Sequence, residues 1–189
     1  MNESGGFLLN EDQKKKGFNF KKIVLIAALV AVVVGAGGGI YMLKASDNPE
    51  FCSSCHLMVP YYESWNESNL LAHKHAVSED KLECHDCHEP TLSTQIEEGV
   101  KFITGNYQVP LEKREFPRDF CLECHDDWEN IVAATDYEDS NPHDSHYGEQ
   151  ECHLCHNMHQ QSVVMCAECH YFKWMDELDD SWTTEIKKE

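Results

Sequence analysis

The sequence predicts a mainly α-helical fold with extensive loops and one N-terminal transmembrane helix. Three observations predict it. Residues 23–43 form an unbroken apolar stretch, a Cys-x-x-Cys-His motif recurs five times after it, and apolar–polar alternation over a strand's length is nearly absent. The 146 residues after the apolar stretch must therefore be organised around the motifs.

The five motifs contain all ten cysteines of the chain, and a histidine follows each pair directly. This segment is typical of a covalently attached c-type haem, because two thiols add to the two vinyl groups while the imidazole reaches the iron. Five c-type haems are therefore expected. Their attachment is predicted at Cys52, Cys55, Cys84, Cys87, Cys121, Cys124, Cys152, Cys155, Cys166 and Cys169.

Zinc sites or disulfides explain the motifs less well. Zinc needs four ligands, so Cys-x-x-Cys units usually occur in pairs, and a disulfide does not require the histidine. With 12 histidines in 189 residues, one after every cysteine pair is improbable by chance. About 29 residues per motif are too few for separate apolar cores, so the sequence predicts a multihaem cytochrome c organised around stacked haems.

The apolar stretch, residues 23–43, is long enough to span a bilayer, which takes about 20 residues. We favour an uncleaved anchor over a cleaved signal peptide, whose apolar core would be about 7–15 residues. Five lysines precede the stretch, and only Lys44 follows it closely. The positive-inside rule then places residues 1–22 in the cytoplasm and residues 44–189 on the extracytoplasmic side of the cytoplasmic membrane.

Three helices are expected beyond the anchor. The first starts at Pro60 and extends to Ala72, and the second runs from about Thr91 to Thr104, with Gly105 ending it. The third starts with Asp119 as its N-cap and carries the third motif, Trp128, Ile131 and Val132. Residues 134–150 are predicted as a loop, and the tail after His170 as either a surface amphipathic helix or a disordered segment.

Each iron has two axial positions, and the motif histidines, His56, His88, His125, His156 and His170, are expected to fill one each. Five further histidines are candidates for the second position: His73, His75, His143, His146 and His159. His85 and His153 lie inside motifs and are better suited to packing or bridging. Met58, two residues after His56, is a candidate ligand that competes with His56 or a residue that packs on the haem.

The extracytoplasmic part has 31 Asp and Glu against 10 Lys and Arg, a formal charge of −21. Such a surface repels nucleic acid, and it either attracts basic partners or serves solubility alone.

Residues 51–124 resemble the NapC/NirT/NrfH family of membrane-anchored quinol dehydrogenases, in the segments FCSSCHLM, YYESW, CHDCHEP and FITGNYQVP. The resemblance implies that Met58 is an axial ligand beside an open face for quinol, and that His73 or His75 ligates a later haem. It also implies a menaquinol site, for which Glu97, Glu98 and Lys101 are the nearest candidates.

The remaining motifs are similar to small tetrahaem cytochromes and to the haem domains of flavocytochrome fumarate reductases. This implies that His143, His146 and His159 are distal ligands. Residues 44–130 are then a quinol-dehydrogenase-like half, and residues 131–189 a tetrahaem-cytochrome-like half.

The expected function is oxidation of menaquinol and electron transfer to an extracytoplasmic flavin-dependent or multihaem reductase. One alternative is an electron-transfer cytochrome without its own quinol site, in which case the chain is not itself an enzyme. A less favoured alternative is a terminal reductase of a small molecule. The sequence also allows a homo-oligomer.

Overall fold

The computed structural model describes residues 20–125 and 127–185, and it divides into two units, Met1–Ala45 and Ser46–Glu189. The first unit contains α1 (Phe20–Ala45), which includes the whole predicted apolar stretch. Among the described residues it is the one helix long and apolar enough to cross a membrane, with a mean hydropathy of 2.7. Of the five lysines that precede the apolar stretch, Lys21 and Lys22 lie in the first turn of α1, and Lys14–Lys16 lie outside the described residues.

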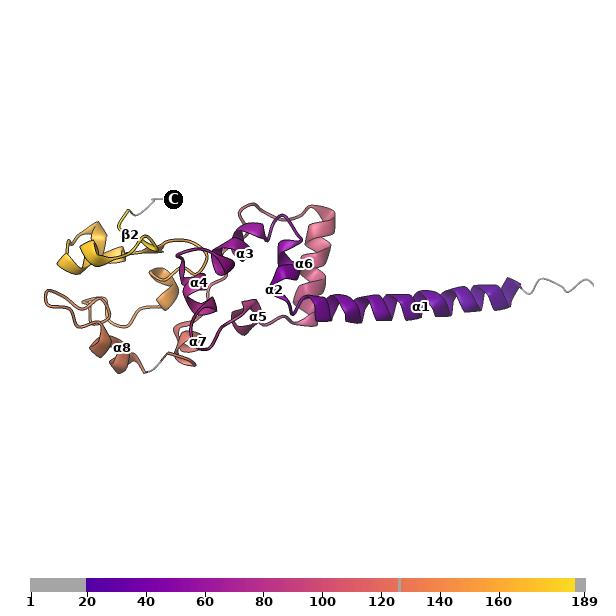
Figure 1. Cartoon of the computed structure of the whole chain (residues 1–189), viewed down its shortest axis with the longest axis horizontal. Coiled ribbons are helices and arrows are strands. Elements are labelled where there is room, and N and C mark those ends of the chain that lie inside the picture. Colours follow the sequence, from indigo (N-terminus) through magenta and orange to yellow (C-terminus); the bar gives the residue numbers. More distant parts are fainter. Residues whose placement is uncertain (1–19, 126, 186–189) are drawn as a thin grey trace, which may run out of the picture. The chain divides into compact units, whose positions relative to one another are not determined.

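The second unit consists of short helices joined by loops, which confirms the predicted fold class (Figure 1). Its helices are α2 (Pro49–Ser53), α3 (Val59–Asn66), α4 (Leu71–Ala76), α5 (Cys84–Cys87), α6 (Leu92–Thr104), α7 (Arg118–Leu122) and α8 (Trp128–Ala134). Three 3₁₀ helices, η1 (Cys152–Leu154), η2 (Met165–Glu168) and η3 (Lys173–Glu177), and two short strands, β1 (Ser162–Val163) and β2 (Trp182–Thr183), complete it.

The helix predicted from Pro60 to Ala72 is in fact two helices, α3 and α4. The Ser68 hydroxyl donates to the carbonyl of Ser64 and accepts the N–H of Leu70, at 3.0 Å. Such local side-chain bonds replace the backbone bonds that a continuous helix would make. The prediction of a single helix was therefore wrong.

The helix predicted from Thr91 to Thr104 is confirmed as α6. Thr91 caps its start, because its hydroxyl accepts the N–H of Thr94 at 3.2 Å. Gly105 ends it in the left-handed conformation, with φ of 71°, which a residue without Cβ adopts at little cost.

The prediction of one helix from Asp119 to Val132 is also wrong, because two separate helices, α7 and α8, lie in this range. Pro117, not Asp119, occupies the N-cap of α7, and Asp119 lies in its first turn. The break falls in the third motif, where the N–H of His125 donates to the carbonyl of Cys121 at 2.9 Å and closes a turn of its own.

Residues 171–185, the described part of the C-terminal tail, are packed, so neither a surface helix nor disorder describes them. Trp174 and Met175 in η3 are buried, and β2 pairs in parallel with β1. The N–H of Ser162 donates to the carbonyl of Ser181 at 2.8 Å. The Trp174 indole donates at 2.7 Å to Ser140, which lies in the loop of residues 135–150, called the acidic loop below. The loop prediction for residues 134–150 holds after Ala134, the last residue of α8.

The apolar core is small. In the part of the chain that the structure describes, the only buried hydrophobic residues are Ala72, Val164, Trp174 and Met175. A unit of this size normally buries a far larger apolar core. The protein interior is therefore built mainly from the motif turns and the histidines around them.

Candidate functional site

The five motifs all begin in a short helix, and four share the same turn. In these four, the N–H of the motif histidine donates to the carbonyl of the first cysteine at 2.8–2.9 Å, which places both thiols and the imidazole on one turn. They are the motifs of His88, His125, His156 and His170. In the first motif, the N–H of Met58 instead donates to the carbonyl of Cys55 at 2.9 Å.

Consecutive motifs lie next to one another. The thiols of Cys121 and Cys152 are within hydrogen-bonding distance, and burial together with Cys152 raises the pKa of Cys121 to about 11. Burial is the main cause that raises the pKa of Cys84, Cys87 and Cys155, and the electrostatic influence of a thiol in an adjacent motif adds to it. Their neighbours in the adjacent motifs are Cys52, Cys124 and Cys166, respectively. None of the ten cysteines forms a disulfide, so every thiol is available for a thioether.

Four motif histidines each face one of the candidate distal histidines. The ring centroids of these pairs are separated by 6.0–6.1 Å, although their interplanar angles differ widely. The pairs are His75 with His125 (85°), His88 with His159 (22°), His143 with His156 (8°) and His146 with His170 (67°).

This spacing fits an iron between the two rings. A metal–imidazole bond is about 2 Å, and the ring centre lies about 1 Å behind its nitrogen, so two axial imidazoles have centroids about 6 Å apart. Among residues 20–125 and 127–185, no group of three His, Cys, Asp or Glu side chains converges as a protein-only metal site requires. A haem iron needs only two protein ligands, because the porphyrin supplies the other four nitrogens.

Three distal histidines are also held in the orientation of a metal ligand. When Nδ1 of a histidine is bonded to a neighbouring oxygen, the ring is fixed and Nε2 is left to face the metal. Nδ1 lies 2.8 Å from the Leu71 carbonyl in His75, 2.6 Å from the Ser64 hydroxyl in His159, and 2.9 Å from the Thr135 hydroxyl in His143.

Burial keeps several of these imidazoles neutral. It is the main cause that lowers the pKa of His88 and of His156 to about 4, with Arg114 adding to it at His88 and neighbouring histidines adding to it at both. Burial also lowers the pKa of His143 and His159. A neutral imidazole offers the lone pair that coordination to iron requires.

The first motif has a different surrounding. The ring of His56 contacts Phe102 of α6, with centroids 6.4 Å apart, instead of a second imidazole. Met58 is half-buried and precedes α3 directly. Among the described residues, no histidine pairs with His56 in this way, and Met58 lies two residues after it. Whether His56 or Met58 ligates the first iron stays a prediction.

Besides His56, three histidines remain outside the pairs. Nδ1 of His73 lies 2.8 Å from the Trp65 carbonyl, and the structure brings His75 rather than His73 opposite a motif histidine. Nδ1 of His85 lies 3.8 Å from Asp47. Nδ1 of His153 lies 3.1 Å from the Phe116 carbonyl, and the packing or bridging role of the histidines inside motifs stays a prediction.

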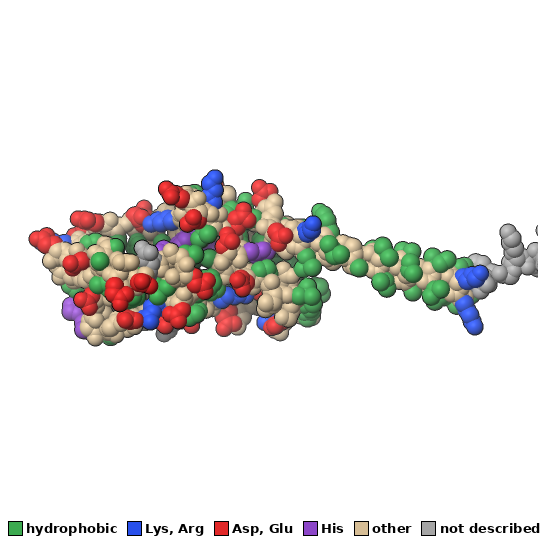
Figure 2. All heavy atoms as spheres, turned by 90° about the horizontal axis from the view of Figure 1, so that it is seen from below, with side chains coloured by type: hydrophobic (Ala, Val, Ile, Leu, Met, Phe, Trp, Pro, Cys, Tyr) green, Lys and Arg blue, Asp and Glu red, His purple; other side chains and the backbone are tan. Residues whose placement is uncertain are grey.

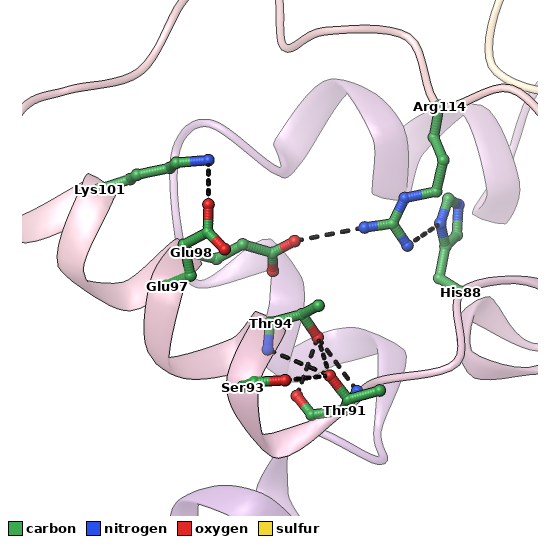
Figure 3. A network of polar contacts seen from close by, with 8 residues as sticks. All are labelled: His88, Thr91, Ser93, Thr94, Glu97, Glu98, Lys101 and Arg114. Atoms are coloured by element: carbon green, nitrogen blue, oxygen red, sulfur yellow. Dashed lines mark hydrogen bonds and ion pairs between the residues drawn. The ribbon is translucent and has the colours of Figure 1, made fainter.

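The candidate quinol residues lie on the polar face of α6 (Figure 3). Lys101 Nζ lies 2.7 Å from Glu97, and its hydrogen bond lowers the pKa of Glu97, whereas a raised pKa would suit a proton acceptor. Glu98 points the other way, 3.4 Å from Arg114, which in turn lies 3.3 Å from Nδ1 of His88. The polar face of α6 is therefore linked to the second motif through Arg114.

Sequence reasoning missed Arg114 and an aromatic stack at the last motif. The ring of His170 stacks on Phe172 at 5.5 Å, Phe172 on Trp174 at 5.9 Å, and Trp174 on Tyr137 at 5.5 Å. The alternation of aromatic rings at positions 170, 172 and 174 was a usable signal for part of this stack. The contact with Tyr137 depends on the fold.

Two family models match the chain. Residues 14–104 match the NapC/NirT cytochrome c family, N-terminal region, and residues 105–171 match cytochrome c3. The two matches meet directly after α6.

Three relatives illustrate the similarity. The cytochrome c-type protein Cgr1 of Eggerthella lenta is 31% identical over 193 residues, covering 85% of this chain and 86% of its own. The cytochrome c-type protein NrfH of Wolinella succinogenes is 26% identical over 57% of this chain and 68% of its own. The acrylate reductase cytochrome subunit of Shewanella woodyi is 34% identical over 54% of this chain and 72% of its own. No solved structure matches the chain.

Proposed function

Because the chain belongs to the NapC/NirT family of membrane-anchored multihaem c-type cytochromes, we propose that it oxidises menaquinol and delivers the electrons to an extracytoplasmic reductase. The observation that carries the proposal is the row of neighbouring motifs, in which each motif has a cysteine near enough to a cysteine of the next to affect its pKa. A row of this kind holds its attachment sites close enough for electrons to pass from one end to the other.

We assign five c-type haems to the ten cysteines. Haem supplies one-electron redox chemistry, and two axial imidazoles leave no open coordination position. The four histidine pairs therefore favour electron transfer over substrate binding at those sites. Intact mass of the purified protein should exceed the polypeptide by five haems, and replacing Cys166 and Cys169 by Ala should remove one of them. A count of four in the parent would contradict the assignment.

The electron entry is assigned to the first motif, where His56 faces Phe102 instead of an imidazole. Quinol oxidation releases two protons, so a carboxylate is needed as the proton acceptor. Glu97 and Glu98 are the proposed acceptors and Lys101 the neighbouring cation. Glu98 is the better candidate, since the hydrogen bond from Lys101 lowers the pKa of Glu97 and weakens it as a base.

The electron exit is assigned to the last two motifs and the acidic loop beside them. The face of the second unit in Figure 2 carries many acidic and few basic side chains. Such a surface steers a partner with a basic patch, and an acrylate reductase cytochrome subunit among the relatives is consistent with a reductase as partner. If α1 spans the membrane once and the exit lies outside the cytoplasm, residues 1–22 lie in the cytoplasm.

A second candidate is an electron carrier without a quinol site, and the exposed Glu97–Lys101 ion pair favours it. Exposed pairs of this kind usually contribute little and need no function. A menaquinol-oxidation assay on the double variant Glu97→Gln, Glu98→Gln separates the two. A loss of roughly 100-fold with normal haem content supports the quinol site. Unchanged oxidation places the quinol site elsewhere, and no oxidation by the parent protein supports the carrier.

A further inference from the structure

The helix α6 carries an apolar face that the second unit leaves exposed. Leu92, Ile96, Val100 and Ile103 are 62%, 61%, 54% and 84% exposed. At 100° per residue these positions fall on one side of the helix, so they form a continuous apolar stripe along its length. Apolar side chains gather at the α6 end of this unit in Figure 2.

The other sides of α6 hold it to the rest of the unit. Glu98 reaches Arg114 at 3.4 Å, and the Phe102 ring contacts His56. Along the stripe there is open space, since a Cβ built on Gly99, in its middle, meets no atom within 4 Å. The apolar stripe is therefore directed away from the packed side of the helix.

The length of the chain limits how far α6 can lie from the end of α1. His56 comes eleven residues after Ala45, the end of α1, and five of them form α2. At about 1.5 Å per helical residue and about 3.5 Å per extended one, this segment spans at most roughly 30 Å. Phe102 of α6 contacts His56. The segment between Ala45 and His56 therefore keeps α6 within reach of the bilayer that contains α1.

From these observations we propose that α6 lies in the lipid–water interface, with its apolar stripe among the acyl chains and its polar face in water. An exposed apolar face of this length marks an interaction surface, and helices of this amphipathic pattern bind membrane surfaces. Lipid is the favoured occupant because the anchor keeps it at high local concentration, whereas a second copy or a soluble partner must be recruited. This inference concerns lipid contact and is independent of quinol oxidation.

The charges of α6 make the proposal more specific. Its polar face has Glu97 and Glu98 against Lys101, so attraction to anionic lipid is not expected to contribute. Burial of the apolar stripe should drive the binding of α6 to the bilayer, and α6 should bind neutral and anionic bilayers equally well.

The test is lipid photolabelling of the full-length, haem-loaded protein in phosphatidylcholine vesicles that contain a diazirine-acyl phosphatidylcholine. Mass spectrometry should find lipid adducts in residues 92–103 in addition to α1. The variant Ile96→Glu, Ile103→Glu should lose most of the α6 adducts while the α1 adducts persist. The variant Val77→Glu is a control, because Val77 is an exposed apolar position outside α6, and it should label like the parent. Parental haem spectra in each variant would show that the fold is intact.

Two other outcomes would overturn the proposal. If adducts are confined to α1 while a water-soluble carbene reagent labels the stripe, α6 lies in water. If neither reagent labels the stripe, a protein surface covers it. Adducts that appear only when phosphatidylglycerol is added would contradict the uncharged mode of binding.

Discussion

The imidazole rings of His143 and His156 lie 8° from parallel, whereas those of His75 and His125 are almost perpendicular, at 85°. The centroid distances are nearly the same, at 6.1 and 6.0 Å, so the two pairs differ in orientation and not in spacing. Each angle is set by the neighbours of the rings, such as the Thr135 hydroxyl at His143 and the Leu71 carbonyl at His75.

This difference predicts two classes of low-spin ferric haem. Parallel axial imidazoles give rhombic electron paramagnetic resonance spectra, and perpendicular ones give highly anisotropic spectra with a single dominant low-field feature. The oxidised protein should show both classes. His143→Met should remove a rhombic component and His75→Met an anisotropic one. A spectrum with only one class would contradict the assigned pairs.

Replacement of Met58 should affect one haem alone. A thioether ligand raises the reduction potential of its haem, so Met58→Ala should alter one optical spectrum, lower one potential and slow menaquinol oxidation. Met58→Leu keeps most of the volume without the sulfur and separates ligation from packing. If the leucine variant matches the parent, Met58 only packs on the haem.

Replacing Arg114 and replacing Glu98 should shift the reduction potential of the haem at His88 in opposite directions. The guanidinium lies 3.3 Å from His88 and disfavours the ferric state, so Arg114→Gln should lower one potential by on the order of 50 mV. Glu98 offsets this cation at 3.4 Å, so Glu98→Gln should raise the same potential. Redox titration monitored by optical spectra provides the measurement, and shifts of the same sign would exclude this electrostatic role.

The acidic loop should control delivery to a basic partner. Asp136 and Glu138 are exposed, so Asp136→Asn with Glu138→Gln should slow reduction of a basic cytochrome c at low salt and reduce its salt dependence. Glu79→Gln with Asp80→Asn removes the same charge from a loop near the second motif and is the control. Equal effects of the two pairs would mean that net charge, and not the loop, steers the partner.

The pairing of Asp179 with Lys74 should make the packing of the tail acid-sensitive. Hydrogen bonds from Lys74 and then Ser181 lower the pKa of Asp179 from 3.8 to about 2. A carboxylate with a lowered folded-state pKa stabilises the fold above its unfolded pKa, and this contribution is lost as pH falls from about 4 to about 2. The protection of amides in β1 and β2, relative to the intrinsic exchange rate at each pH, should therefore fall over that range, and it should already be lower at neutral pH in Asp179→Asn. Asp180→Asn, an exposed neighbour, should exchange like the parent.

The packed tail also changes how the electron exit can be tested. Deletion after Phe172 would remove Trp174, Met175 and β2, and with them two of the four buried hydrophobic residues of the described chain. Loss of activity in such a deletion would report unfolding, so charge substitutions in the loop are the cleaner experiment.

The sequence alone determined the features that depend on neighbouring residues. The Cys-x-x-Cys-His motifs, the apolar stretch inside α1, and the ends of α6 near Thr91 and at Gly105 are all local, and each was predicted with its residues. The family could be recognised for the same reason, because its motifs are short and continuous.

Only the tertiary structure decided which histidine faces which motif. His88 and His159 are 71 residues apart, and His75 and His125 are 50 apart, so their pairing depends on how the chain returns on itself. The same holds for the tail, whose Trp174 is buried through contacts with residues that sequence patterns cannot pair in advance. The break between α3 and α4 also escaped prediction, because the bonds of one serine outweighed a helical pattern that continued on both sides.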